Sequence, residues 1–306
     1  MQNETSTFVS NSTNQYKGGN TIDRKPLITF IILVFLISWP LFLVPLAFKN
    51  ADAGTRQIIT IVAFALAMWV PGIAAIIATL TSGGSFRDLN LRRLGPKRFY
   101  IWAWLLFPIL TIVSGVVTVL FGIGEFDSNF TIINNMLQGS KTLNLSLFVV
   151  AQIGAALTIA TLFNTLITMG EELGWRGFLL PKLLPLGQWK AILISNIIWG
   201  LWHAPVIVQG LNYPGYPIAG IFMMVVFTLL LGTIFSWLYL NTKSPWTPAL
   251  AHGSVNAIAS LPVLFLIPGF DMALGGTLAS VAGWLGLFVF VGWLVVSKRL
   301  PVPEMD

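Results

Sequence analysis

The residues of this chain that could do chemistry are few and lie in three short clusters between positions 171 and 256. Each cluster pairs a reactive side chain with a second polar or aromatic one: Glu171, Glu172 and Arg176; Trp199 and His203; His252 and Asn256. The chain has only two histidines and no cysteine, which excludes a disulfide framework, a cysteine-based metal site and a thiol nucleophile. Any chemistry must therefore come from carboxylate, imidazole and amide groups.

Helical spacing separates the roles of the two glutamates. Residues four apart share one face of a helix, so Glu172 faces Arg176, and we predict a structural ion pair between them. Glu171 lies about 100° around the helix from Glu172, and its own neighbour four residues on is Trp175. Because Glu171 has no local cation, we predict that it is free to take a proton from water and acts in acid–base chemistry.

The two histidine clusters follow the same spacing. His252 and Asn256 place an imidazole and a carboxamide on one helix face, where they could bind a metal ion or donate hydrogen bonds to an oxyanion. Trp199 lies four residues before His203, and we interpret it as a packing or membrane-interface aromatic. Pro205 follows His203 closely, so we expect it to disturb the helix there.

The composition places these clusters in a membrane. The chain is 56% hydrophobic and 9% charged, with a mean hydropathy of +0.81, whereas soluble domains have about 25% charged residues. A transmembrane helix needs about 20 mostly apolar residues. We therefore predict an all-α, polytopic membrane bundle of about eight helices. The expected spans are Leu27–Phe48, Gln57–Thr81, Tyr100–Gly122, Leu145–Met169, Lys190–Val208, Pro217–Leu240, Trp246–Ile267 and Ala273–Val296.

The basic residues predict the orientation of this bundle. Of the 17 Lys and Arg residues, only Lys49, Arg56 and Lys141 fall on the side opposite both termini. Since cytoplasmic loops carry the excess of basic residues, we expect a multi-pass protein of the cell membrane with both termini cytoplasmic. The pI of about 9.7 then reflects topology and contact with anionic lipid headgroups, and it does not indicate binding to nucleic acid.

The chain is expected to form one transmembrane unit between two tails. Residues 1–25 are rich in Ser, Thr and Asn without periodicity, which predicts a disordered cytoplasmic tail. Residues 26–300 form the predicted bundle, with a catalytic core at about 145–260, and residues 301–306 form a short cytoplasmic tail.

Together, the three clusters resemble the motifs of the CPBP family of intramembrane metalloproteases, which includes type 2 CAAX prenyl proteases and bacteriocin-processing, Abi-like proteins. That family's pattern has two glutamates followed by an arginine, an aromatic residue four before a histidine, and a histidine four before an asparagine. In this chain Trp199 stands where phenylalanine is commoner, and the reactive groups are intact. The resemblance covers about residues 145–260.

The resemblance implies an intramembrane endopeptidase that hydrolyses a peptide bond of a membrane-associated or lipid-modified, CAAX-type protein or peptide near the cytoplasmic face. Two mechanisms fit the residues. In the first, Glu171 and His203 activate a water while His252 and Asn256 stabilise the oxyanion, without a metal. In the second, His203, His252 and Glu171 hold a divalent ion such as zinc, which activates the water.

Two other functions could use the same polar cluster. A proton-coupled transporter would relay protons through Glu171, His203 and His252, but it would also need polar groups toward both faces, and the first three spans have few. A bacteriocin self-immunity factor would keep the motif for structure alone. Other intramembrane protease types fit poorly, because His-Glu-x-x-His is absent and Ser254, beside His252, does not face it on a helix.

Overall fold

The computed structural model describes residues 22–136 and 144–303, and within them the regular elements are helices apart from an isolated bridge between Phe126 and Leu266. The α-helices are α1 (Arg24–Ala47), α2 (Ala53–Thr81), α3 (Arg98–Leu120), α4 (Thr131–Met136), α5 (Leu145–Ala155), α6 (Thr161–Gly174), α7 (Leu180–Leu183), α8 (Gln188–Trp202), α9 (Ala204–Val208), α10 (Ala219–Thr242), α11 (Trp246–Ile258) and α12 (Val281–Val296). Short 3-10 or π segments join some of them: η1 (Phe86–Leu89), η2 (Ala156–Ala160), η3 (Trp175–Leu179), η4 (Leu184–Leu186) and η5 (Leu261–Phe265). Most of the predicted N-terminal tail, residues 1–21, and residues 304–306 of the C-terminal tail lie outside the described residues.

Six segments of the described chain are long and apolar enough to cross a membrane. They are Arg24–Ala47, Ala53–Thr81, Arg98–Leu120, Leu145–Leu186, Ala219–Thr242 and Trp246–Phe265. The prediction of an all-helical, multi-pass membrane protein is therefore confirmed. The predicted number of eight spans is not, because the other two predicted spans contain only shorter helices.

Those two spans are interrupted for local reasons. Lys190–Val208 divides into α8 and α9 at His203, where Pro205 lacks the amide hydrogen that a continuous helix would need. Ala273–Val296 becomes helical only at Val281. Before it the chain turns through Gly276, whose φ of +80° suits glycine, and Ser280 caps the helix by accepting a hydrogen bond from the Gly283 amide.

The predicted span Leu145–Met169 is too short. The helix continues past both glutamates to Leu186 as one 42-residue segment of α5, η2, α6, η3, α7 and η4. Glycines at 170, 174 and 177 weaken a helix but leave its amide hydrogens in place, so burial inside the protein can hold it. The segment contains two π turns, and the second, Trp175–Leu179, directly follows the glutamates. Such π turns occur frequently at functional sites.

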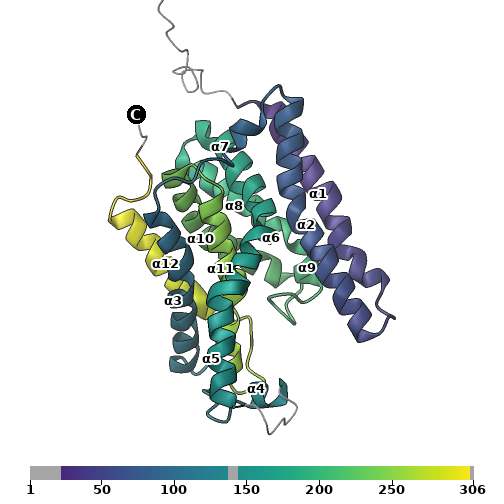
Figure 1. The fold of residues 1–306 in the computed structure, drawn as a ribbon, viewed down its shortest axis with the longest axis vertical. Coiled ribbons are helices and arrows are strands. Elements are labelled where there is room, and N and C mark those ends of the chain that lie inside the picture. The colour runs from purple at the N-terminus through teal and green to yellow at the C-terminus, as the bar shows by residue number, and fades with distance from the viewer. Residues whose placement is uncertain (1–21, 137–143, 304–306) are drawn as a thin grey trace, which may run out of the picture.

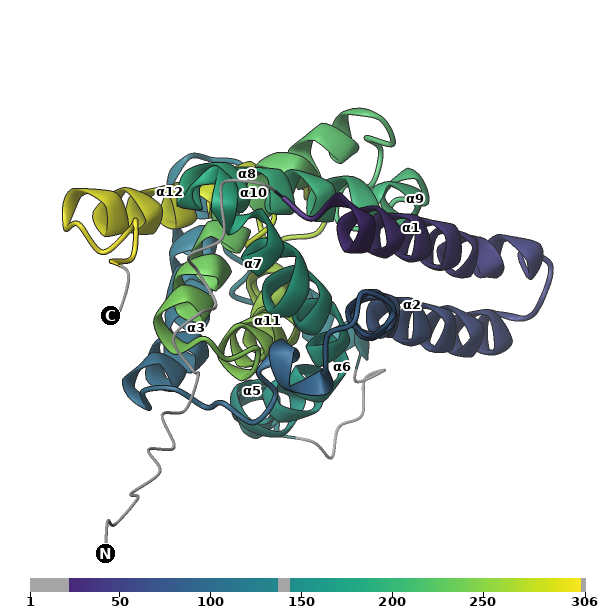
Figure 2. The ribbon, with the colours of Figure 1, turned by 90° about the horizontal axis from the view of Figure 1, so that it is seen from above.

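The helices form a bundle with the polar clusters inside. In Figure 1, α1 and α2 run side by side along one edge, α3 and α12 lie toward the opposite edge, and α6, α8, α10 and α11 lie between them. Seen from above in Figure 2, the α1–α2 pair projects to one side of this central group. Large apolar side chains such as Leu36, Ile112 and Phe288 are exposed, whereas polar side chains of α6 and α11 are buried. This distribution is expected for a protein whose solvent is lipid.

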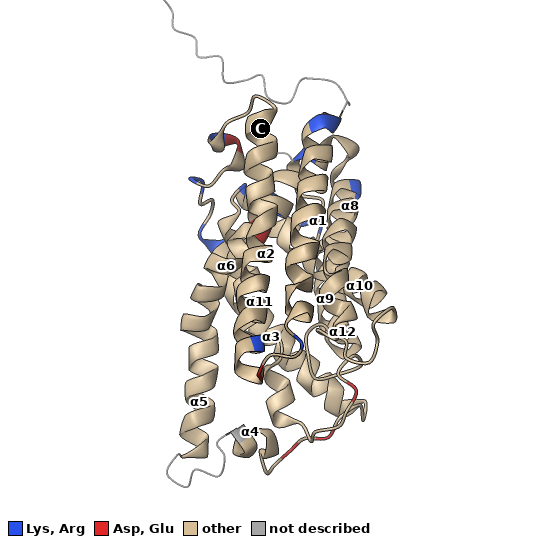
Figure 3. Ribbon diagram, turned by 90° about the vertical axis from the view of Figure 1, so that its right-hand side faces the viewer, with Lys and Arg blue, Asp and Glu red and all other residues tan. Residues whose placement is uncertain are grey.

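The charged residues divide between the two ends of the bundle. Figure 3 shows most Lys and Arg residues toward the end at which α1 begins, where α3, α8 and α11 also begin. We call it the basic end. The loops at the opposite end hold acidic residues, among them Glu125, Asp127 and Asp271. The described basic residues at that end are Lys49 and Arg56.

Candidate active site

Glu172 is the hub of a buried network that joins α6 to α11. Its carboxylate is fully buried, and one oxygen, Oε1, accepts hydrogen bonds from Arg176 Nη1 at 3.0 Å and from His252 Nδ1 at 2.8 Å. The predicted contact with Arg176 is thus present, and the link to His252, 80 residues away, is additional. The buried carboxylate is held by one cation and by a second hydrogen-bond donor, His252 Nδ1. This network therefore fixes the position of His252.

Arg176 extends the network to α8 and α10. Its Nη2 donates to Asn196 Oδ1 at 3.0 Å, and its guanidinium carbon lies 4.2 Å from the centre of the Trp199 ring. Room for this arrangement comes from Gly232 on α10, where a Cβ would lie 2.7 Å from Arg176 Nη2. Because Arg176 is 1% exposed, its charge is neutralised inside the protein and not by water.

Glu171 has a different partner and faces a different space. Its Oε2 accepts a hydrogen bond from the indole Nε1 of Trp199 at 2.8 Å, and the two residues lie 28 positions apart in the sequence. This contact orients the carboxylate through one of its two oxygens. Trp199 therefore does more than pack, which corrects its interpretation as a packing or membrane-interface aromatic.

His203 lies where α8 ends and α9 begins, and its ring is held by the backbone. Its Nδ1 lies 2.8 Å from the carbonyl oxygen of Trp199. Since a carbonyl only accepts, Nδ1 carries the hydrogen and Nε2 of the neutral ring is the free acceptor. The ring also packs edge-on against Trp202, with centroids 4.9 Å apart. His203 can therefore accept a hydrogen bond from a water.

His252 is oriented in a comparable way by a carboxylate. Its Nδ1 donates to Glu172, and its ring packs against Trp199 and Phe235 at centroid distances of 5.4 Å and 5.5 Å. α11 approaches α6 closely beside it, because Gly253 has no side chain: a Cβ there would lie 2.5 Å from the Thr165 amide nitrogen. The small residue thus lets the imidazole reach the glutamates.

These groups meet around one cavity of about 540 Å³. Glu171, His203, His252 and Asn256 all line it, and Asn256 is exposed there. Glu172 and Arg176 are not among the lining residues. The other walls are mainly apolar and come from several elements: Phe42, Phe64, Met68, Trp199, Trp202, Val206, Leu211, Asn212, Met224, Phe227, Thr228, Leu231, Val255, Ala259, Ser260, Met272, Thr277 and Ala279. The arrangement can hold an apolar ligand against a few polar groups.

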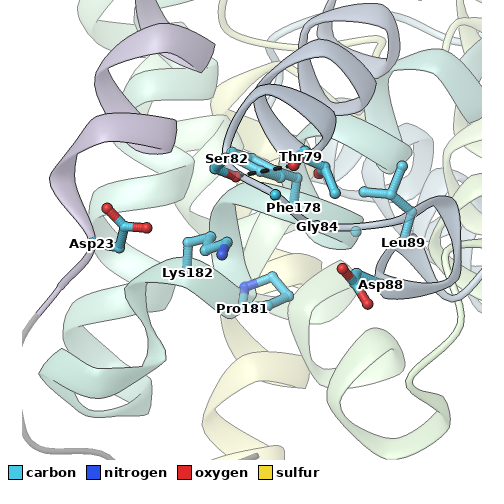
Figure 4. A pocket seen from close by; sticks show the side chains of 11 residues that line it. Asp23, Thr79, Ser82, Gly84, Asp88, Leu89, Phe178, Pro181 and Lys182 are labelled. Carbon is cyan, nitrogen blue, oxygen red and sulfur yellow. Dashed lines mark hydrogen bonds between the residues drawn. The ribbon is translucent and has the colours of Figure 1, made fainter.

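Two further cavities contain none of the predicted site residues. One, of about 280 Å³, is lined by Asp23, Asp88 and Lys182 near the basic end, and Figure 4 shows Lys182 between the two carboxylates. The other, of about 540 Å³, is an apolar groove beside α3 and η5 with walls such as Ile112 and Val116. Neither wall contains a histidine, so neither offers the acid–base pair of the first cavity.

The structure brings the six predicted site residues into one connected site. Two residues of that site were not predicted as partners, Trp199 and Asn196. For Trp199 a signal exists in the sequence, because an indole has an N–H donor that the commoner phenylalanine lacks. For Asn196, the signal is weaker: a polar amide in an otherwise apolar stretch of α8 indicates that the residue has a hydrogen-bond partner inside the bundle.

The side chains do not fit the predicted zinc set of His203, His252 and Glu171. The described residues contain no group of three or more His, Asp or Glu side chains placed to hold a metal ion. Asn256 does not complete the set, since zinc ligands are Cys, His, Asp and Glu. The hydrolysis proposed for this site uses no metal ion.

Comparison with known families agrees with this site. The described fold is that of a multi-pass membrane protein, and its Glu, His and Asn side chains line one cavity. Residues 152–258 match the family model described as type II CAAX prenyl endopeptidase Rce1-like, and this range contains all three clusters. Residues 152–258 are therefore similar to the Rce1-like domain of that family, which is also called CPBP or Abi. No curated protein matches the chain.

Proposed function

We propose that the protein is an intramembrane endopeptidase that hydrolyses a peptide bond of a membrane-anchored or lipidated peptide with a water activated by Glu171 and His203. One observation carries this proposal: Glu171, His203, His252 and Asn256 come from three separate segments and line the same largely apolar cavity. Membership of the Rce1-like family suggests a protease and prenylated substrates.

The residues support a metal-free hydrolysis. Water donates one hydrogen bond to Glu171 and one to Nε2 of His203, and its oxygen attacks the scissile carbonyl carbon as Glu171 takes the proton. Asn256 donates a side-chain N–H to the oxyanion. His252 adds a second donor, Nε2–H, when both of its ring nitrogens carry hydrogen from the outset, and the Glu172 carboxylate at Nδ1 stabilises that charged form throughout the step. Collapse of the tetrahedral intermediate breaks the C–N bond as Glu171 returns the proton to the leaving amine.

The bundle gives this centre an environment inside the membrane. We place α8 with α9, and α12, in the bilayer together with the six long segments, which gives eight crossings. Support comes from the chain path: α8 begins at the basic end and α10 begins at the opposite end, so the intervening segment must pass through the bundle. The basic residues favour a cytoplasmic position for the basic end and both termini.

The proposal is tested by cleavage in detergent, where a substrate can approach from any side. The purified protein should cleave a synthetic farnesylated peptide that carries a fluorophore and a quencher on opposite sides of its carboxy-terminal bonds. The same peptide without the farnesyl group controls for the need for a lipid anchor. If neither peptide nor any lipidated variant of it is cleaved, the proposal fails.

Chelation is expected to leave this activity unchanged. Because no group of three His, Asp or Glu side chains among the described residues is placed to hold a metal ion, the proposed hydrolysis uses no metal-bound water. Cleavage rates should be measured after dialysis against 1,10-phenanthroline and against its non-chelating 1,7 isomer. A loss that only the chelating isomer causes, and that zinc restores, would contradict the metal-free mechanism.

Replacing Trp199 with phenylalanine should lower kcat by about tenfold or more with little change in KM. An aromatic ring that can pack on Arg176 and His252 is kept, while the N–H that orients Glu171 is lost together with part of the indole's volume. A hydrogen bond to a charged group contributes about 1.5–3 kcal/mol, which corresponds to at least that factor in rate.

Trp202→Phe is the matched control for this change. Trp202 also lines the cavity and packs on His203, but its Nε1 has no hydrogen-bond partner within the described structure. Its kcat should therefore stay near that of the wild type. Equal losses in the two variants would show that the indole ring, and not its hydrogen bond to Glu171, is what matters.

A further inference from the structure

The connection between α2 and α3 lies at the membrane surface and carries a dense group of positive charges. Both helices are long and apolar enough to cross a membrane, so the residues that join them must lie at its surface. This connection belongs to the basic end of the bundle (Figure 3). We call residues 82–98 the basic loop. Its basic side chains are all exposed, and they are Arg87, Arg92, Arg93, Lys97 and Arg98.

These charges have no ion-pair partner within the described structure. The ion pairs among the described residues join Glu172 to Arg176 and to His252, and neither includes a residue of the basic loop. The single acidic residue of the loop, Asp88, accepts a hydrogen bond from the Ser85 amide at 2.8 Å. Five exposed cations without an acidic partner attract an anionic partner from outside the chain.

Contacts with the bundle hold the basic loop in one conformation. Leu89 is 1% exposed and packs in the hydrophobic core. The indole Nε1 of Trp246, the first residue of α11, donates a hydrogen bond to the Leu91 carbonyl oxygen at 2.8 Å. Gly95 approaches the end of α10 so closely that a Cβ there would lie 2.6 Å from Thr242 Cβ. The charges are therefore held in position before a ligand binds, which lowers the entropic cost of binding.

Two large apolar side chains of the basic loop are exposed beside its charges. Phe86 is 51% exposed and Leu94 is 60% exposed. At a membrane surface, apolar side chains enter the boundary between headgroups and acyl chains, while Lys and Arg side chains donate hydrogen bonds to phosphate oxygens. A soluble anion would leave both apolar side chains in water. The combination of fixed cations and exposed apolar groups therefore favours a lipid as the partner.

We infer that the basic loop is a preformed binding surface for the phosphate headgroups of anionic membrane lipids, and that the bound lipid stabilises the contact between the loop and α11. A ligand that binds the conformation held by Trp246 must stabilise that conformation. The same helix carries His252, six residues further along the chain. Orientation of the protein in the membrane requires only the charges, whereas this role also requires the folded shape of the loop.

Lipid binding at the basic loop can be measured with a local fluorophore. The chain contains no cysteine, and Ser82 is an exposed residue at the end of α2, so Ser82→Cys places a single dye beside the charges. The labelled protein is reconstituted into phosphatidylcholine vesicles that contain a small fraction of brominated phosphatidylglycerol or the same fraction of brominated phosphatidylcholine. Brominated phosphatidylglycerol should quench the dye more strongly. Equal quenching by the two lipids would overturn the inference.

Neutralising two charges of the loop should weaken this preference. Arg92→Gln combined with Arg93→Gln is expected to lower the preference for phosphatidylglycerol by about tenfold or more, because each charge adds to the attraction of an anionic surface. Arg24→Gln combined with Lys25→Gln is the matched control, since it removes the same charge from exposed residues at the start of α1. The control should keep most of the preference. Equal losses in the two double variants would show a general attraction of the basic end and would contradict a site at the loop.

Trp246→Phe tests the folded shape of the loop without changing a charge. It removes the N–H that holds the Leu91 carbonyl, so it should weaken the preference for phosphatidylglycerol. It should also reduce the rise in unfolding temperature that phosphatidylglycerol causes in the wild type. Trp189→Phe, at a 38% exposed tryptophan of α8 outside the loop, should change neither quantity. If Trp246→Phe behaves like Trp189→Phe, the coupling of the lipid site to α11 is refuted.

A soluble phosphate distinguishes a lipid site from a general phosphate site. An excess of glycerol phosphate should leave the quenching by brominated phosphatidylglycerol unchanged, because it offers no acyl chains to Phe86 and Leu94. Displacement of the lipid by glycerol phosphate would contradict the assignment to a membrane lipid. None of these measurements requires turnover, so their outcome is independent of the proposed endopeptidase activity.

Discussion

Glu171→Gln is expected to abolish most cleavage, lowering kcat by about 10²- to 10⁴-fold, the range attributed to general acid–base catalysis. Glutamine has the same shape and still accepts the hydrogen bond from Trp199 Nε1, so the cavity should keep its form. It cannot take a proton from water at neutral pH. Rates are measured with the farnesylated peptide in detergent, and folding is checked by thermal unfolding.

Glu125→Gln is the matched control for this variant. Glu125 is an exposed carboxylate in the loop between α3 and α4, away from the cavity, and its replacement should leave kcat unchanged. Turnover by Glu171→Gln within a few fold of the wild type would refute the role of Glu171 as the base. A large loss accompanied by a fall in unfolding temperature would instead show that Glu171 holds the fold.

Much of the site's geometry could be predicted from the spacing of neighbouring residues in the sequence. The contact between Glu172 and Arg176 follows from a separation of four residues on a helix, and the break of α8 at His203 follows from Pro205. Both depend only on neighbouring residues. The approximate positions of six apolar helices were also predictable, because hydrophobic length suffices to identify a membrane span.

Contacts between distant segments were not predictable in the same way. The hydrogen bonds of Trp199 with Glu171 and of His252 with Glu172 join residues 28 and 80 positions apart. They depend on how closely α6 approaches α8 and α11, and for α11 this approach is allowed by Gly253, where a Cβ would lie 2.5 Å from the Thr165 amide nitrogen. Hydropathy also predicted the end of the fourth helix wrongly. That helix continues through three buried ionisable residues, Glu171, Glu172 and Arg176, because protein and not lipid surrounds this part of it.

Arg176→Ala is expected to lower the free energy of unfolding by about 3–5 kcal/mol, the usual result of removing one partner of a buried ion pair. Glu172 would keep only the hydrogen bond from His252, and its second oxygen, Oε2, already lacks a hydrogen-bond partner within the described structure. The change can be measured by thermal or denaturant-induced unfolding in detergent micelles. Lys182→Ala, an exposed basic residue on the same continuous helix, is the control and should have little effect.

A double variant separates the lost charge pair from the lost volume. Combining Arg176→Met with Glu172→Gln removes both charges, keeps an acceptor for His252 Nδ1 and fills most of the space between Trp199 and Phe235. Because the cost of Arg176→Ala comes mainly from leaving Glu172 charged and unpaired, the double variant should unfold at a higher temperature than either Arg176→Ala or Arg176→Met alone. If the losses simply add, the two residues are not energetically coupled, and packing rather than the ion pair holds the buried network in place.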